Sequence, residues 1–185
     1  FEFDNREASP YAIRIRLMWN NMRETVIKNF PDSPGLPTNK KEYLEKMDEK
    51  YVSDAYHSLS IEGYQVSPQL IELVRRGKWN PNASEFDNRQ KDAMAARGYW
   101  QAFQKVKESI RAVLNGENPG AVADTDHGAW YRELFAPAVT AGIIKASDLA
   151  GYRNSQVYIK GANHVPPNAA PVRDAMPALF NLLQE

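Results

Sequence analysis

The hydrophobic residues of this chain recur mostly three and four positions apart, which is the spacing of one face of an α-helix. The longest such run covers residues 87–114 and is closed by Asn115-Gly116. Further runs cover residues 10–30, 41–61, 130–141 and 170–183, and a short one follows Ser67. Serine before proline at Ser9-Pro10 and Ser67-Pro68 is typical of a helix start. The pattern predicts a mostly α fold with about six to eight helices.

One stretch favours a β-strand. Residues 155–160 alternate polar and apolar side chains and are rich in β-branched residues. Residues 161–163 can turn, His164-Val165 can return, and Pro166-Pro167 then stop the pairing. The sequence therefore predicts one β-hairpin in an otherwise helical domain.

Composition narrows the class of protein. With 185 residues, 43% of them hydrophobic, the chain can bury one sizeable core. Its 23 basic and 23 acidic residues cancel, so no net field favours nucleic acid or an anionic membrane. The sequence has no apolar run of membrane-spanning length. The absence of cysteine excludes disulfides and thiol chemistry and suits a cytoplasmic location.

The three histidines do not form a metal motif. His57, His127 and His164 are far apart in sequence, and none has a second ligand three or four residues away. We therefore expect no metal site in this chain. The four tryptophans have no basic patch beside them, so we interpret them as core or groove residues.

The most informative stretch is the end of the run over residues 41–61. Ser58 and Glu62 are four residues apart, so on a helix they share a face and can form a hydroxyl-carboxylate pair that holds a cation. Gly63 directly after them is a helix-stop signal. From the residues alone, a solvated helix end is the more common explanation of such a glutamate.

Four segments, in this order, resemble the Fic family of AMP-transferring enzymes, in the form whose inhibitory helix precedes the catalytic core. They are Ala55–Gly63, Ala95–Trp100, Ala150–Arg153 leading into Val157-Tyr158-Ile159, and His164–Pro167 followed by a helix with Val172, Met176 and Leu179. The resemblance covers Tyr51 to the C-terminus. It implies an N-terminal helical region over residues 1–50 and an inhibitory helix with the front part of a Fic domain over residues 51–185.

The resemblance implies a role for each matching residue. Glu62 would bind the catalytic-loop arginine that otherwise holds the ATP γ-phosphate, and Ser58 would steady that contact. The hairpin would be the family's flap, which holds an extended segment of the target protein by strand addition. The flap residues are Val157, Tyr158, Ile159 and Lys160. Arg153 at its base would form a structural ion pair. The implied reaction moves AMP from ATP, with magnesium, to a hydroxyl side chain of another protein.

One departure from the family decides what this chain can do. The family's catalytic signature, histidine-x-phenylalanine-x-acid-Gly-Asn-Gly, is absent from the 185 residues, and no Gly-x-Gly occurs. The chain thus has no catalytic residue, no cofactor site of its own and an incomplete core. We expect it to be the regulatory and target-docking portion of a longer enzyme, cut before the catalytic motif. Expected partners are the missing C-terminal part of its own core, a protein target and a second copy, but no nucleic acid or membrane.

Two other interpretations remain open from the sequence. In the first, the chain is a stand-alone helical interaction module without catalysis. In the second, it is an intact protein whose Fic-like fold has lost its chemistry. The reading frame after Glu185 distinguishes both from the portion of a longer enzyme, because only that portion requires a histidine-bearing Gly-Asn-Gly loop there.

Overall fold

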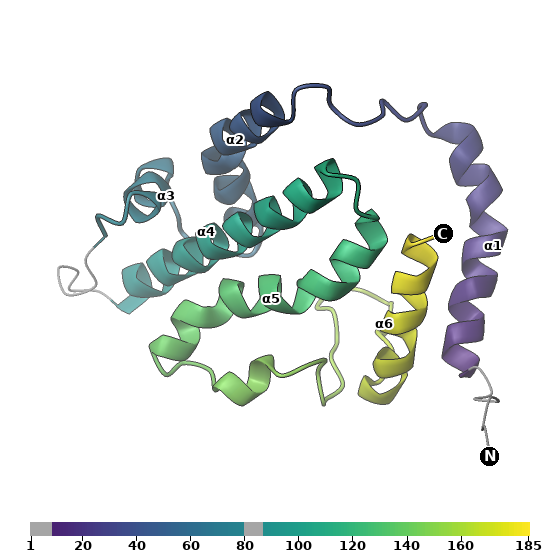
Figure 1. Ribbon diagram of the computed structural model, residues 1–185. Coiled ribbons are helices and arrows are strands. Elements are labelled where there is room, and N and C mark those ends of the chain that lie inside the picture. Colours follow the sequence, from purple (N-terminus) through teal and green to yellow (C-terminus); the bar gives the residue numbers. More distant parts are fainter. Residues whose placement is uncertain (1–8, 80–86) are drawn as a thin grey trace, which may run out of the picture. The chain divides into compact units, whose positions relative to one another are not determined.

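The computed structural model describes residues 9–79 and 87–185. Over those residues the chain is mostly helical and contains no β-strand, so the mostly α prediction is confirmed. The helices are α1 (Pro10–Asn29), α2 (Lys40–Ile61), α3 (Pro68–Arg75), α4 (Asp87–Leu114), α5 (Pro119–Thr140) and α6 (Ala169–Leu183), as labelled in Figure 1. A short 3-10 helix, η2 (Ala146–Leu149), lies between α5 and α6.

Side-chain caps explain where these helices begin. Ser9 caps α1 and Ser67 caps α3, and in both cases proline follows at the first helical position. The side chain of Asn39 accepts a hydrogen bond from the Glu42 N–H and caps α2. Each cap satisfies an N–H group that has no partner within the helix. The start signals predicted at Ser9-Pro10 and Ser67-Pro68 are therefore confirmed.

The chain divides into two compact units that are interleaved in sequence. One unit contains the described parts of Phe1–Gly35, Glu117–Thr125 and Gly151–Glu185, and the other contains Leu36–Gly116 and Asp126–Ala150. The predicted boundary after residue 50 falls inside α2, which is continuous from Lys40 to Ile61. We describe each unit separately.

The second unit has its core where α2, α3 and α4 pack together. Tyr51 on α2 and Ile71 on α3 are fully buried there, and Ala93 and Ala96 let α4 approach closely. The Tyr51 ring lies against Trp100 at 4.7 Å and Phe103 at 4.9 Å between centroids. Burial of the Tyr51 ring and its contacts with these two partly buried aromatic side chains stabilise this unit.

The first unit is built on the helix pair α1 and α6, which lie side by side in Figure 1. Pro171, Phe180 and Leu182 of α6 are buried, whereas α1 buries no residue. Arg16 and Glu185 form an ion pair at 3.0 Å, and both side chains are exposed. Because exposed pairs contribute little to stability, the apolar face of α6 is the main contribution to the packing of this pair.

The prediction of a β-hairpin is wrong, because residues 155–160 and 164–167 form no strand. The two arms are joined by side chains instead of a backbone ladder. Gln156 donates a hydrogen bond to the Pro166 carbonyl at 2.8 Å, and Arg153 donates to the carbonyls of Ser155 and Pro167. Pro166 and Pro167 have no N–H to donate, and an isolated two-stranded hairpin is marginally stable at best. Arg153 therefore bonds backbone carbonyls rather than the ion-pair partner we expected.

The helix predicted over residues 130–141 begins earlier than its apolar run. Helix α5 begins at Pro119, where the Asn118 side chain accepts a hydrogen bond from the Ala121 N–H at 3.1 Å. Asn118-Pro119 is thus the same cap-and-proline signal as Ser9-Pro10. Gly120 in this first turn lies against the Leu183 backbone, where an added Cβ would be 2.3 Å from the carbonyl oxygen.

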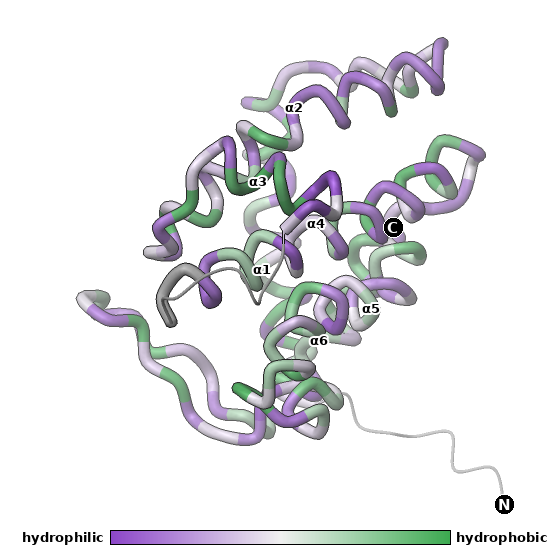
Figure 2. The backbone as a smooth tube through the Cα atoms, turned by 90° about the vertical axis from the view of Figure 1, so that its left-hand side faces the viewer, coloured by the Kyte–Doolittle hydropathy of each residue, from purple (hydrophilic) through white to green (hydrophobic). Residues whose placement is uncertain are grey.

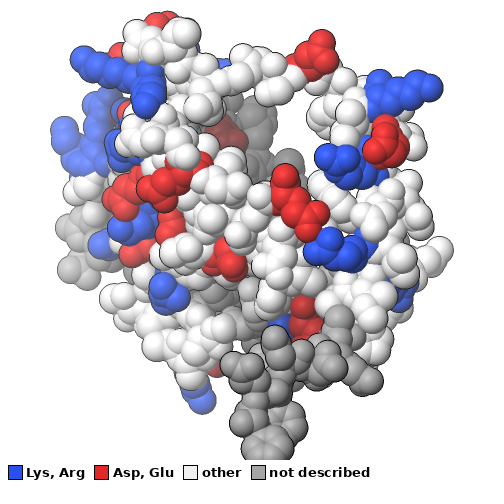
Figure 3. All heavy atoms as spheres, turned by 45° about the vertical axis from the view of Figure 1, so that its right-hand side comes forward, with Lys and Arg blue, Asp and Glu red and all other residues white. Residues whose placement is uncertain are grey.

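Hydrophobic and hydrophilic positions are interleaved along the helices, as Figure 2 shows. In the part of the chain that the structure describes, no helix has both the length and the apolar character needed to cross a membrane. On the face drawn in Figure 3, acidic and basic side chains are interspersed. This distribution agrees with the zero net charge of the sequence.

Candidate functional site at the end of helix α2

The end of α2 is closed by a left-handed glycine. Gly63 has a φ of +85°, a conformation that favours glycine over other residues. Its N–H donates to the Ser60 carbonyl at 3.0 Å, and the Tyr64 N–H donates to the Leu59 carbonyl at 3.0 Å. This pair of bonds is the Schellman motif of helix ends. The helix-stop role predicted for Gly63 is confirmed.

Ser58 does not pair with Glu62. The structure has no hydrogen bond between these two side chains, both of which are described. Ser58 Oγ instead lies 3.2 Å from the hydroxyl oxygen of Tyr99 on α4. The same Tyr99 hydroxyl donates to Asp54 Oδ2 at 2.6 Å. Burial raises the pKa of Tyr99, and the hydrogen bond to Asp54 raises it further, so the phenol keeps its proton.

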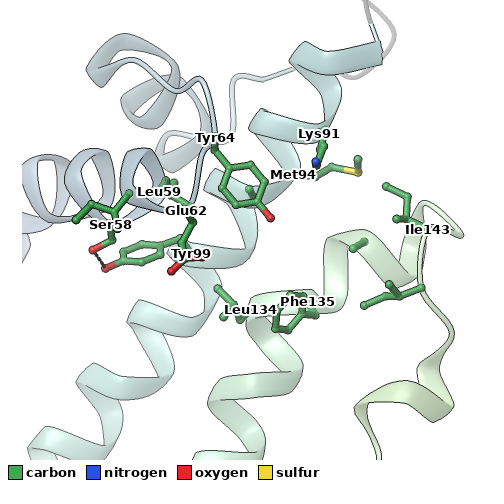
Figure 4. A pocket seen from close by; sticks show the side chains of 14 residues that line it. Ser58, Leu59, Glu62, Tyr64, Lys91, Met94, Tyr99, Leu134, Phe135 and Ile143 are labelled. Carbon is green, nitrogen blue, oxygen red and sulfur yellow. Dashed lines mark hydrogen bonds between the residues drawn. The ribbon is translucent and has the colours of Figure 1, made fainter. Parts of the chain in front are cut away.

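Ser58 and Glu62 nevertheless line one pocket. Its volume is about 660 Å³, and Figure 4 shows its labelled side chains. Ser58, Leu59 and Glu62 come from the end of α2, and Tyr99 comes from α4. The opposite lining is apolar and consists of Leu134, Phe135 and Ala138 on α5 with Ile143 and Ile144 after it. The pocket is therefore an apolar hollow with a few polar groups from α2 and α4, which is the usual make-up of a ligand or partner site.

Glu62 is the unpaired acidic group of this pocket. It is exposed and lines the pocket, and no described residue donates a hydrogen bond to its carboxylate or forms an ion pair with it. Lys91 also lines the pocket, but its amine lies over the Tyr64 ring, 5.6 Å from the centroid. A carboxylate at the edge of an apolar hollow can bind a cationic group whose neighbouring atoms are apolar.

The close approach of α4 and α5 forms one wall of the pocket. Gly98 of α4 faces the backbone of Leu134, and a Cβ at this position would lie only 1.9 Å from the Leu134 carbonyl oxygen. Only glycine permits this contact. Leu134 and Phe135 are brought to the pocket by it.

The predicted flap residues lie in the other unit. Val157, Tyr158, Ile159 and Lys160 are all exposed, and Tyr158 is 76% accessible. The backbone N–H groups of Val157, Tyr158 and Ile159 have no hydrogen-bond acceptor among the described residues. Free N–H groups beside exposed apolar side chains are what an added strand requires. The segment thus has the features of a strand-addition site without forming a hairpin of its own.

Metal ligands are not gathered in the described residues. No group of three or more His, Asp or Glu side chains there is close enough to hold a metal ion. A second hollow of about 470 Å³ lies at the start of α2, and its Lys107 is paired with Asp48. The hollow at Glu62 combines apolar walls with a carboxylate that has no ion-pair partner among the described residues.

Sequence reasoning missed Tyr99 and Asp54. Asp54 is four residues before Ser58 on the same helix face, and this spacing was a signal that could have found it. Tyr99 had no local signal, because its role depends on how α2 packs on α4. Comparison with known proteins adds no further assignment: no family model, no curated protein and no solved structure matches this chain.

Proposed function

We propose that the end of α2 is the regulatory segment of a Fic-type protein adenylyltransferase, which moves AMP from ATP, with magnesium, to a hydroxyl side chain of another protein. Glu62 is the inhibitory carboxylate in this proposal. The observation that carries it is the position of Glu62, which lies exposed on the apolar pocket with no cationic partner among the described residues. A regulatory carboxylate that binds an arginine from another segment must be exposed and must have no other cationic partner.

The chemistry of the pocket supports an arginine as the partner. Arginine combines an apolar stem with a planar cation, so it suits a hollow with apolar walls and a carboxylate at the edge. A carboxylate bound to this arginine occupies the place of the ATP γ-phosphate. The two anions then compete, and ATP is held less well while Glu62 is bound.

The exposed segment at residues 157–160 supports a docking role. Its free N–H groups and exposed apolar side chains suit an extended peptide from the target protein. Arg153 and Gln156 brace the segment from its base through bonds to backbone carbonyls. The segment is therefore held in place without closing the edge that a target would use.

The proposal assigns catalysis to residues outside the printed sequence. In this proposal the base, the phosphate-binding glycine loop and the magnesium-binding acid are supplied by residues that this sequence does not contain. ATP and magnesium are then ligands of that longer protein. The same catalytic residues would partly cover the apolar pocket. The alternative is that a second copy of the chain covers it.

Two measurements test the proposal. The first is the reading frame after Glu185, which must continue into a histidine-bearing Gly-Asn-Gly loop. The second is calorimetric titration of the full-length protein with ATP and magnesium. Glu62→Gln keeps the side-chain shape and removes the charge, so it should lower the Kd for ATP by about tenfold or more, the value of a charge-assisted hydrogen bond. Glu117→Gln, at an exposed position between α4 and α5, is the matched control. An ATP affinity that Glu62→Gln leaves unchanged contradicts the proposal.

The second candidate is a helical interaction module without catalysis. The observation that favours it is the exposure of large apolar residues along α1, with Leu17, Met22 and Ile27 each about half accessible. Such a face suits contact with another helix. A stop codon directly after Glu185, together with association of the chain into dimers, would favour this candidate over the enzyme.

A further inference from the structure

Asp54, Ser58 and Glu62 follow one another at intervals of four residues, so they lie along one stripe of α2. The first two are hydrogen-bonded, whereas the third has no hydrogen-bond or ion-pair partner for its side chain among the described residues. Tyr99 reaches both of the bonded residues, Asp54 at 2.6 Å and Ser58 at 3.2 Å. One side chain of α4 thus holds two successive turns of the helix that ends at Glu62.

The protons of this network can be assigned from its chemistry. A phenol has one proton to donate, and the shorter contact to a carboxylate takes it. Ser58 then donates its own proton to the Tyr99 oxygen, which has a free lone pair. The resulting order is Ser58 to Tyr99 to Asp54, and every hydroxyl proton in it has an acceptor. Ser58 consequently has no proton left for Glu62.

Buried apolar contacts hold α2 only as far as Leu59. Tyr51, Ala55 and Leu59 are buried on three successive turns, and no residue of the helix after Leu59 is buried. Residues 60–63 are exposed, with Ile61 84% accessible. The next hydrogen bond to α4 runs from the Gln65 N–H to Asp92 Oδ1 at 3.2 Å.

We propose that Tyr99 is the positioning residue of this site. By bonding both Asp54 and Ser58, it adds hydrogen bonds to the buried apolar contacts of α2 and so holds the last turn of the helix, with the Glu62 carboxylate, at the pocket. Tyr99 also lines the pocket, but in this proposal it acts through α2. The consequence for AMP transfer rests on the proposed function, but the consequence for the structure does not.

Hydrogen exchange on the 185-residue chain tests the structural part. The reporters are the amides of Glu62, Gly63 and Tyr64, which close the helix end. Tyr99→Phe and Ser58→Val should each accelerate exchange there by about tenfold, as expected for the loss of one hydrogen bond. Ser58→Thr is the matched control, because threonine has the shape of valine and keeps the hydroxyl. The Gly116 amide, which closes the far end of α4, should be unchanged in all three variants.

The outcomes are distinct. Slow exchange in Ser58→Thr with fast exchange in Ser58→Val and Tyr99→Phe supports the proposal. Equal exchange in Ser58→Val and Ser58→Thr, or wild-type exchange in Tyr99→Phe, overturns it. A general loss of stability would also accelerate the Gly116 amide, and that result counts against a specific positioning role.

A second arm uses labelled AMP transfer by the full-length protein. Tyr99→Phe should raise transfer in the wild-type background and add nothing in the Glu62→Gly background, because Tyr99 acts through Glu62. If Glu62→Gly raises transfer and Tyr99→Phe does not, the positioning role fails and the proposed function stands. If Glu62→Gly has no effect, the proposed function fails, and the exchange experiment still decides the role of Tyr99.

Discussion

Gly98 lies where α4 passes α5 with no room for a side chain, and its replacement by alanine gives a sharp test of the packing around the pocket. An added Cβ would be 1.9 Å from the Leu134 carbonyl oxygen and 2.9 Å from its carbon. Cβ atoms keep at least 3.0 Å from other atoms, and both partners here are backbone. No rotamer change relieves the clash, so α5 has to move away from α4.

The energy follows from two opposing effects. Overpacking of this kind costs about 1–3 kcal/mol, and a backbone obstacle favours the upper half of that range. Alanine in place of glycine within a helix returns about 0.5–1 kcal/mol. We therefore expect Gly98→Ala to lose about 1–2 kcal/mol of the free energy of unfolding, which corresponds to a fall in Tm of several degrees for a chain of this size.

Gly128→Ala is the matched control on α5. A Cβ there meets only Arg132 Nη1, at 3.3 Å, and the end of this flexible side chain can move aside. Gly128→Ala should consequently be neutral or slightly stabilising. Urea unfolding of the two variants measures the difference, and the methyl resonance of Met94 in the pocket reports whether the α5 wall has moved. A Gly98→Ala variant as stable as Gly128→Ala would refute this packing argument.

Buried groups and the missing motif lead to four further predictions. Tyr51→Phe should leave the free energy of unfolding unchanged or raise it by about 1 kcal/mol, because the buried Tyr51 hydroxyl has no hydrogen-bond partner among the described residues. A loss of about 1 kcal/mol in urea unfolding would contradict this. Burial raises the pKa of Tyr51, so wild-type stability should be intact below about pH 10 and fall above it, with a shallower fall in Tyr51→Phe. Asp48→Asn should lower the free energy of unfolding by about 1–3 kcal/mol, because it leaves the buried Lys107 ammonium without its charged partner. Lys107→Met should lower it less, and equal losses in the two variants would show that the ion pair does not matter. The 185-residue chain alone should not bind ATP with micromolar affinity, and calorimetric titration with ATP and magnesium checks this.

Helix periodicity predicted much of this fold correctly because most helices here carry their own start and stop signals. The run over residues 87–114 matches α4 at both ends, and the signals at Ser9-Pro10 and Ser67-Pro68 mark α1 and α3. The same signal at Asn118-Pro119 was missed, because Gly120 and Gly128 weakened the helical pattern after it. Gly120 serves packing against Leu183 rather than a turn, which local sequence does not reveal.

The hairpin was predicted from alternation, which reports the side-chain pattern but not the pairing of backbone groups. The return arm contains Pro166 and Pro167, so it cannot supply the N–H groups of a ladder. Gln156 and Arg153 use their side chains to join the arms instead. Long-range hydrogen bonds of this kind have no periodic signature.

At the candidate site, too, local patterns were predicted from the sequence and long-range contacts were not. The spacing of Ser58, Glu62 and Gly63 predicted a helix end with two polar groups on one face, and both groups line the pocket. The partner of Ser58 could not be predicted, because Tyr99 is 41 residues away in sequence and meets α2 only through tertiary packing. Residues that position a site through contacts with another helix can be identified only from the structure.

In the proposed function, the Glu62 carboxylate restrains AMP transfer. The most direct measurement is transfer of labelled AMP, to itself or to lysate proteins, by full-length wild-type protein and its Glu62→Gly variant, with Glu117→Gly as the matched control. Removing the competing charge should raise transfer by about tenfold to a hundredfold, the range of one charge-assisted contact. The control should transfer like the wild type. Equal transfer by wild type and Glu62→Gly, or less by the variant, would contradict the claim and leave Glu62 as a solvated helix end.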